Sequence, residues 1–555
     1  MLTKTNHTSL LFSEFNLPEQ DLSKLSFCGS NSEKVQQWLE SLPITRITET
    51  SILLYKALPE ICRLKIAPDK RIDMLEVVYP KVHQCIEGLM LELLRQPLIL
   101  PTQMMKMAVV AQALQRHLND AYMVAFKHLL PTKKSTLPQQ RLALCLYRAI
   151  SGMGLLLLRS YQLYTPQPTD IWRKLHALYL LAIEKQWEKI AVKDVLLKNR
   201  QSMTVNSAYL RNLLLACSAP HRLRQVDIAY IFQAFEQCSS MVQLQLARRD
   251  NRQSLYWVSL RSDRGPFYRD RLRGEPDDNT YAIHLEPLVH ALESENKTEG
   301  STRHKINLTV PHKNALVTHL LHSWQNANTR LSERLASNDQ LEICVGLTAI
   351  HNQLLDGDSF VSLFDGVQQP LSYSTGPSET LNVSWGSKNK PIENTATVKN
   401  NSVFLTARAT NSSVSGYCLI WDDNISDKIR VGELLGIRNT VDNGWQIGII
   451  CWAQRFKEKV YTGIHLLSKK ANAYAASTVL PDGNNSACFR SLVLIDSNLT
   501  EANTIIVPSI PFGIDQTVRL QRYKHQSRIR LVNLLLASTS ISQFSYRPLD
   551  LEPTA

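Results

Sequence analysis

The stretch Asn411-Ser412-Ser413-Val414-Ser415-Gly416 decides how the rest of this sequence is interpreted. It lies between two segments rich in β-branched and aromatic residues, 403–410 and 417–421, so we expect it to connect two strands. Short Asn and Ser side chains donate and accept hydrogen bonds, and glycine lets the backbone turn sharply or come close to a ligand. Most segments of this composition are plain polar loops. The surrounding sequence decides whether this segment is a plain loop or part of a ligand-binding site.

More strand-like segments lie on either side of this loop. They are short, rich in β-branched and aromatic residues, and separated by turn residues, among them Asp442-Asn443-Gly444, which suits a type I′ hairpin. Several short strands with such turns predict a small antiparallel barrel. The predicted strands are 341–347, 428–437, 445–452 and 460–467.

Two arginines, Arg330 and Arg334, come just before the first of these strands, at the end of a helix predicted over 311–334. Residues four apart on a helix project to the same side, and planar guanidinium groups suit phosphate oxygens or a guanine edge. The same Arg-x-x-x-Arg spacing occurs twice elsewhere in the chain, and an arginine pair at a helix end is usually a solvated surface. The spacing alone is therefore not specific.

The segment from about residue 325 to 470 resembles a PilZ domain, the bacterial receptor module for cyclic di-GMP. The signature of that family is Arg-x-x-x-Arg ahead of the first barrel strand, followed by Asp/Asn-x-Ser-x-x-Gly on the next strand connection. The resemblance implies that the arginines hold phosphates and guanine, while the polar loop residues hold the guanine bases. The matching residues are Arg330, Arg334, Asn411, Ser413 and Gly416.

Asn411 follows Arg334 by 411 − 334 = 77 positions, a longer separation than the family norm. Much of the excess is the segment 356–401, which is rich in Ser, Asn, Thr, Gly and Lys and contains three prolines. This composition predicts a disordered surface insertion, which a barrel tolerates because the cost of closing a loop grows slowly with its length.

The first half of the chain is predicted to be helical. From Glu33 to about Met241 the apolar residues recur at three- and four-residue spacing, and prolines separate the segments. A helix that begins at Ile72 is expected to pause at Tyr79-Pro80. We interpret residues 1–295 as an all-α interaction domain with a short β segment near 242–285.

The C-terminal residues 486–555 are predicted to form a small β domain, because alternating apolar and polar residues recur in short runs. Its strands carry several arginines. Such a face suits nucleic acid or an anionic ligand, although a solvated strand surface is commoner, and we assign no chemistry to this domain.

The composition fits a globular protein of several domains, with 44% hydrophobic and 20% charged residues among 555. The ten cysteines form no Cys-x-x-Cys pair, which predicts reduced thiols and no metal site. The first residues contain no apolar signal segment, and we expect no membrane span and a cytoplasmic location. The net charge of +13 favours anionic partners, but no dense basic tract points to nucleic acid.

The chain contains no familiar nucleotide-hydrolase, hydrolase or metalloprotease motif, so we do not expect an enzyme, a cofactor or a catalytic residue. The predicted fold is a multidomain α+β protein: an N-terminal all-α domain, a central PilZ-like antiparallel β-barrel over 305–475, and the C-terminal β domain. The predicted function is a cyclic di-GMP receptor that couples ligand binding to contact between the helical domain and an unidentified protein partner. The alternatives are a PilZ-like interaction scaffold that binds no nucleotide, or a basic nucleic-acid-binding protein.

Overall fold

The structure is a computed structural model of the chain. It divides into two compact units, the first within residues 1–329 and the second built mainly of residues 330–555. The residues it describes are 15–43, 45–96, 98, 100–130, 139–248, 254–272, 274–297, 313–326, 334–364, 404–421, 426–439, 444–456, 459–479, 485–495, 503–538 and 540–549.

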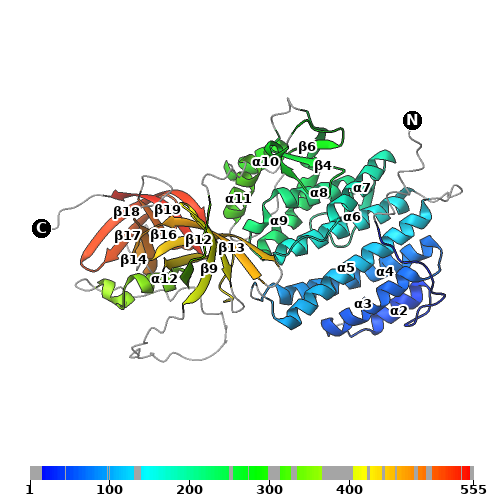
Figure 1. Cartoon of the computed structure of the whole chain (residues 1–555), viewed down its shortest axis with the longest axis horizontal. Coiled ribbons are helices and arrows are strands. Elements are labelled where there is room, and N and C mark those ends of the chain that lie inside the picture. Colours follow the sequence, from blue (N-terminus) through cyan, green and yellow to red (C-terminus); the bar gives the residue numbers. More distant parts are fainter. Residues whose placement is uncertain are drawn as a thin grey trace. The chain divides into compact units, whose positions relative to one another are not determined.

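The first unit is a bundle of α-helices whose apolar faces meet in one core (Figure 1). Its helices are α2 (Ser32–Ser41), α3 (Ile47–Arg63), α4 (Pro68–Leu93), α5 (Thr102–Leu129), α6 (Gln139–Gln162), α7 (Ile171–Glu184), α8 (Val205–Cys217) and α9 (Gln225–Cys238). Helix α5 lies between α4 and α6 and packs against both. Apolar residues at helical spacing, such as Leu114, Leu118 and Ala121 of α5, are completely buried between these helices.

The pause predicted at Tyr79-Pro80 is wrong, because α4 continues through Pro80. A proline inside a helix removes one backbone hydrogen bond and usually costs about 3 kcal/mol. The residues on both sides of it, Val78, Tyr79 and Val82, are buried in the core. This packing keeps the two turns in one helix where the local sequence favours a break.

Helix α6 is the one helix among the described residues with the length and apolar composition of a membrane span. Of its most apolar stretch, 67% is buried inside the unit. Packing in the centre of the bundle therefore accounts for its composition without a membrane.

A small antiparallel sheet and two helices complete the first unit. The sheet has the strand order β3-β6-β4-β5. Its elements are β3 (Gln243–Leu246), β4 (Tyr256–Ser259), β5 (Phe267–Tyr268), β6 (Thr280–His284), α10 (Glu286–Lys297) and α11 (Lys313–Gln325); a separate two-stranded pair is formed by β1 (Ala191–Lys193) and β2 (Ser202–Thr204).

Helix α11 differs in its packing from the expectation. The sequence analysis assigned this helix to the barrel domain over 305–475. The helix was predicted over 311–334, and its last residue in the described part of the chain is Gln325. Its apolar residues Leu316, Leu320 and Trp324 are buried in the core of the helical unit. Periodicity identified the apolar face of this helix, but it carries no information about which core receives that face.

The second unit begins with a closed six-stranded antiparallel barrel. The strand order is β10-β13-β12-β11-β8-β9, and β9 also pairs with β10, which closes the ring; β7 lies on the outer edge beside β9. The strands are β7 (Leu335–Ala336), β8 (Gln340–Val345), β9 (Leu405–Ser413), β10 (Gly416–Trp421), β11 (Leu434–Asn439), β12 (Gln446–Phe456) and β13 (Lys459–Ser468).

A second closed barrel follows, with the strand order β14-β15-β16-β19-β18-β17. Its strands are β14 (Ala471–Thr478), β15 (Phe489–Leu494), β16 (Thr504–Pro508), β17 (Thr517–Arg522), β18 (His525–Ala537) and β19 (Ile541–Leu549). Strand β14 lies before the predicted start at 486. Its sequence is mostly Ala, Asn and Ser, which have little β propensity, so it was not recognised as a strand.

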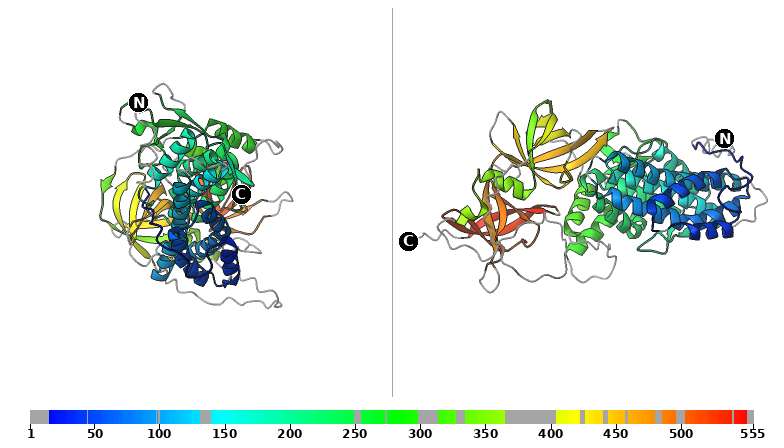
Figure 2. Two further views of the ribbon diagram at one scale, coloured as in Figure 1. Left: turned by 90° about the vertical axis from the view of Figure 1, so that its right-hand side faces the viewer. Right: turned by 90° about the horizontal axis from the view of Figure 1, so that it is seen from below.

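Helix α12 (Leu347–Leu354) packs against strands of both barrels. Its Ile350 is fully buried in a cluster that contains Leu434 and Ile447 of the first barrel with Leu492 and Ile506 of the second. Figure 2 shows the two barrels as separate sheets, yellow and orange-red, within this unit. The predicted fold class, helical domain followed by barrel and β domain, is confirmed.

Candidate ligand-binding site

The stretch 411–416 forms a tight hairpin and not an open loop. Asn411, Ser412 and Ser413 are the last residues of β9, and Gly416 is the first residue of β10. Only Val414 and Ser415 form the turn, since Ser413 pairs directly with Gly416. The polar side chains are therefore fixed on strands of the first barrel.

Gly416 lies where neighbouring backbones leave no room for a side chain. A Cβ atom at this position would overlap the carbonyl oxygen of Ile464 on β13. The turn is held on the same strand, because the backbone N–H of Leu466 donates to the Ser415 carbonyl at 2.9 Å. The glycine of the motif thus brings the hairpin tip down onto β13.

His465 lies beside this hairpin. It pairs with Gly416 across the ladder, and burial lowers the pKa of its imidazole, while a hydrogen bond to the Ser415 backbone acts in the opposite direction. His465 therefore contacts the turn and was not among the predicted site residues.

Ser413 is half-buried, and the contacts of its hydroxyl with the described part of the chain are long. Its Oγ lies 3.3 Å from the Gly416 carbonyl and 3.3 Å from the hydroxyl of Ser415. Both distances exceed the usual O–H···O separation of about 2.8 Å, so the hydroxyl can turn toward a better partner. Asn411 is half-buried two residues before it on the same strand.

Strand β7 carries Arg334 to the edge of this hairpin. Leu335 pairs with Ser412 and Ala336 pairs with Asn411 in an antiparallel ladder. Continued by one residue, this register places the exposed Arg334 opposite Ser413. Opposite residues of antiparallel strands lie on the same face, so a guanidinium and a hydroxyl share one surface. Arg330 lies outside the described residues.

This surface is the outer face of the barrel. On β9 the outward residues Thr406 and Arg408 are exposed, whereas Ala407 and Ala409 face inward and are buried; Leu419 of β10 pairs with Ala409. Asn411 pairs with Cys418, which occupies the opposite face from Leu419. A ligand on this face is open to solvent on one side.

An aromatic ring, that of Trp452 on β12, lies on the same face, two strands away from β10. The ladder continues from Cys418 to Gly463 on β13 and from Gly463 to Trp452 on β12. The indole of Trp452 lies directly over Gly463, where any Cβ would overlap it. Strands are about 4.8 Å apart, so Gly463 is about 10 Å from Asn411. A base held by Asn411 and Ser413 would therefore have an aromatic plane on the same surface.

The described part of the site combines one exposed cation, small polar groups and a nearby aromatic ring. Guanidinium groups bind phosphate oxygens in a bidentate manner, and amides and hydroxyls read the edge of a base. Among the described residues, no cluster of three or more His, Cys, Asp or Glu side chains suits a metal ion. The surface is suited to an anionic nucleotide.

Comparison with family models identifies all three parts of the chain. Residues 33–250 match the N-terminal domain of the cyclic-di-GMP receptor FimW, residues 255–387 and 372–473 match its middle PilZ domain, and residues 474–549 match its C-terminal β-barrel domain. The middle part of the chain therefore matches a PilZ domain, as the resemblance implied. The match to the middle PilZ domain starts at residue 255, earlier than the predicted 325, and takes in strands β4, β5 and β6 of the small sheet in the first unit but not β3.

A curated relative agrees with these matches. The chain is 26% identical to the cyclic-di-GMP receptor FimW of Pseudomonas aeruginosa strain PAO1 over 588 aligned residues, which cover 99% of this chain and 94% of the relative. No solved structure matches the chain. The matched families describe a receptor and not a class of enzyme.

The sequence missed two residues of this PilZ surface, Trp452 and His465. Both stood in segments that the resemblance already included, Gly448–Trp452 and Thr462–Leu467. Only the strand register shows that they share a face with Asn411 and Gly416, and register depends on which strands are neighbours.

Proposed function

We propose that this protein is a cyclic di-GMP receptor whose binding surface is the β9–β10 hairpin with Arg334 beside it. The observation that carries the proposal is the pairing of β7 with β9, because it brings Arg334 to Ser413 across a long stretch of sequence. The match to the PilZ domain of a cyclic-di-GMP receptor supports the same ligand. Arg330, the other arginine of the signature, completes the cation pair in this proposal.

Each group has a role in the proposal. Arg334 binds phosphate and guanine. Asn411 and Ser413 donate hydrogen bonds to a guanine edge and accept hydrogen bonds from it. Gly416 keeps the hairpin packed against β13, so that the ligand can approach the backbone closely. Trp452 offers its indole face to the second base, since stacking on an aromatic ring contributes about 1–3 kcal/mol per base.

The helical unit is the output side of the receptor in this proposal. Ligand binding at the barrel changes how that unit contacts a protein partner, which requires the ligand to bind one conformation more tightly than another. No catalytic step is assigned to the chain.

We place the receptor in the cytoplasm. All ten cysteines are free thiols, as is usual in a reducing compartment, and the one span-like helix among the described residues is mostly buried.

Calorimetric titration of the full chain with cyclic di-GMP tests the proposal. The wild type should bind, and Arg334→Ala and Ser413→Ala should each bind about 10- to 100-fold more weakly, since hydrogen bonds to charged groups contribute about 1.5–3 kcal/mol. Arg528→Ala on the second barrel removes another exposed arginine and is the matched control.

Two outcomes would replace the proposal. No binding by the wild type leaves an interaction scaffold with a PilZ fold. Equal loss of binding in Arg528→Ala, with affinity that falls steeply with salt and extends to DNA or RNA, indicates a non-specific polyanion binder.

A further inference from the structure

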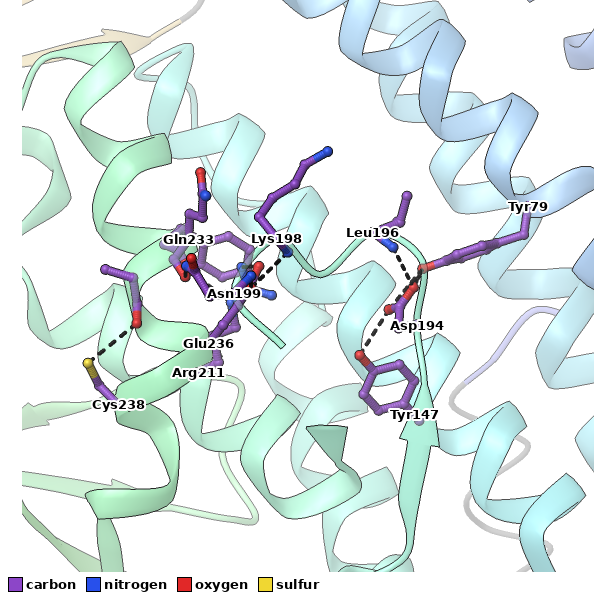
Figure 3. Close-up of polar contacts among 12 residues, drawn as sticks. Tyr79, Tyr147, Asp194, Leu196, Lys198, Asn199, Arg211, Gln233, Glu236 and Cys238 are labelled. Atoms are coloured by element: carbon purple, nitrogen blue, oxygen red, sulfur yellow. Dashed lines mark hydrogen bonds and ion pairs between the residues drawn. The ribbon is translucent and has the colours of Figure 1, made fainter. Parts of the chain in front are cut away.

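The interior of the helical unit contains several buried charges, and most of them are paired. The carboxylate of Asp194 accepts hydrogen bonds from the hydroxyls of Tyr79 and Tyr147 at 3.2 and 2.9 Å (Figure 3). It also pairs with Arg148 at 2.9 Å. A buried carboxylate with a cation and several donors is fully satisfied.

A second buried carboxylate is satisfied in the same way. Glu236 of α9 accepts from the backbone N–H groups of Lys198 and Asn199 at 3.0 and 2.8 Å (Figure 3). It pairs with Arg211 of α8 at 3.1 Å. The polar network between α8, α9 and the loop after β1 therefore leaves these carboxylates no open position.

Arg159 of α6 is different. Its side chain is buried, and both terminal nitrogens donate to one amide oxygen, Gln115 Oε1, at 3.2 and 3.3 Å. Among the described residues no carboxylate lies within 4.0 Å of it. Burial lowers its pKa to about 10, and the negative charge of Glu87 acts in the opposite direction. It therefore stays cationic at neutral pH, and the charge of Glu87 acts on it without a direct ion pair, which is costly for a buried group.

His83 of α4 is also incompletely satisfied. It is buried, and its Nε2 has no hydrogen-bond partner among the described residues. Burial lowers the pKa of its imidazole well below the usual value, and the positive charges of Arg159 and Arg148 lower it further. A neutral imidazole still offers one N–H donor.

Both groups line the same cavity. The cavity has a volume of about 290 Å³, close to the lower limit of about 300 Å³ for small-molecule sites. Its walls include Leu155 and Leu158 of α6, and Leu91 of α4, which is 55% exposed, also lines it. The carboxylates of Glu87, Asp194 and Glu236 line it too, the last two paired with arginines as described above. The cavity thus combines an apolar wall with a cation that has no paired carboxylate and a nitrogen without a partner among the described residues.

We propose that this cavity binds a small organic acid with an apolar chain, whose carboxylate is held by Arg159 and His83. The carboxylate would supply the direct ion pair that Arg159 lacks, and the chain would cover Leu155 and Leu158. The helical unit would then have a ligand of its own, in addition to cyclic di-GMP at the barrel.

Decanoate is a suitable probe, with decanol as its uncharged counterpart. Titrated into the full chain, decanoate should bind the wild type, and Arg159→Gln should weaken decanoate binding about tenfold or more while leaving decanol binding unchanged. Glutamine retains a donor toward Gln115. Cyclic di-GMP binding to the barrel should not change.

Leu155→Trp provides a second test, because the larger side chain fills the cavity and leaves Arg159 in place. If Arg159→Gln does not fold, a folded Leu155→Trp that no longer binds decanoate still supports the proposal. The proposal is overturned if the wild type does not bind decanoate, if folded Arg159→Gln binds it equally well, or if folded Leu155→Trp still binds it.

Discussion

Gly416 shows how one residue links the barrel backbone to the site. We expect Gly416→Ala to displace the hairpin, because its Cβ would overlap the carbonyl oxygen of Ile464. Inserting a methyl group into such a packed position costs about 1–3 kcal/mol. Thermal unfolding should show a lower melting temperature, and titration should show weaker binding of cyclic di-GMP.

Gly444→Ala is the matched control for this substitution. Apart from its chain neighbours, no atom of the described residues lies within 4 Å of the Cβ position at Gly444, so this variant should melt and bind like the wild type. A Gly416→Ala protein with unchanged stability and affinity would show that the close approach at this strand is not required.

A second residue-scale prediction concerns His351 on α12. Burial lowers its pKa to about 4, the nearby Arg490 lowers it too, and a hydrogen bond to the Tyr474 carbonyl opposes both. The unfolded chain binds this proton near pH 6.5. The contribution of the neutral histidine to stability is therefore complete above pH 6.5 and is lost as the pH falls toward 4.

Denaturant unfolding measured at pH 7 and at pH 4.5 tests this sign. His351→Gln keeps a donor for the Tyr474 carbonyl and removes the titrating group. We expect its free energy of unfolding to fall less between the two pH values than that of the wild type. Identical losses in both proteins would contradict the assignment.

Strand β7 has only two residues, yet it carries Arg334 to the hairpin. Leu335→Pro should break its pairing with β9. The N–H of Ser337 donates to the Thr410 carbonyl, so by alternation Leu335 carries the next N–H that faces β9, and proline removes that donor. The edge position of β7 means that barrel stability should hardly change, while cyclic di-GMP affinity should fall about as far as in Arg334→Ala. Calorimetric titration and a melting curve separate the two effects.

Leu335→Ala is the control for the edge strand. Its side chain is 71% exposed, and alanine keeps the backbone hydrogen bonds. Full affinity in this variant and reduced affinity in Leu335→Pro would attribute the loss to the ladder. Full affinity in both variants would mean that cyclic di-GMP binding does not require Arg334 to be held beside the hairpin. That result would contradict the proposed site.

Much of the barrel could be predicted from the sequence, because short strands with β-branched residues and turn residues have a clear pattern. The stretch with Asn411, Ser413 and Gly416 was predicted to connect two strands, and in the structure it is such a connection, a tight hairpin. Trp452 was not recognised, since its place beside Asn411 depends on the order of four strands. Strand β14 was missed because its alanines give no strand signal.

At the scale of the whole molecule, burial shows which parts depend on each other. Helix α11 packs in the core of the first unit, and α12 packs against both barrels. The helical periodicity of the sequence predicts neither of these packing partners. Periodicity identifies an apolar face, whereas the partner of that face is chosen by the complete fold. The buried charges of the helical unit were missed for the same reason, since they come from different helices.

The two barrels share a buried cluster around α12, so we expect them to unfold together. Leu531 is fully buried inside the second barrel alone, and Leu531→Ala should cost about 2–5 kcal/mol there. Hydrogen exchange should then accelerate in β12 and β13 of the first barrel as well as in β17 and β18. Faster exchange confined to the second barrel would show that the barrels are independent.

The most direct test of the central claim is hydrogen–deuterium exchange of the full chain with and without cyclic di-GMP. The claim predicts that saturating ligand slows exchange at residues 334–336, at the 411–416 hairpin and around Gly463, while β17 and β18 do not change. Slower exchange elsewhere with no change at the hairpin would contradict it.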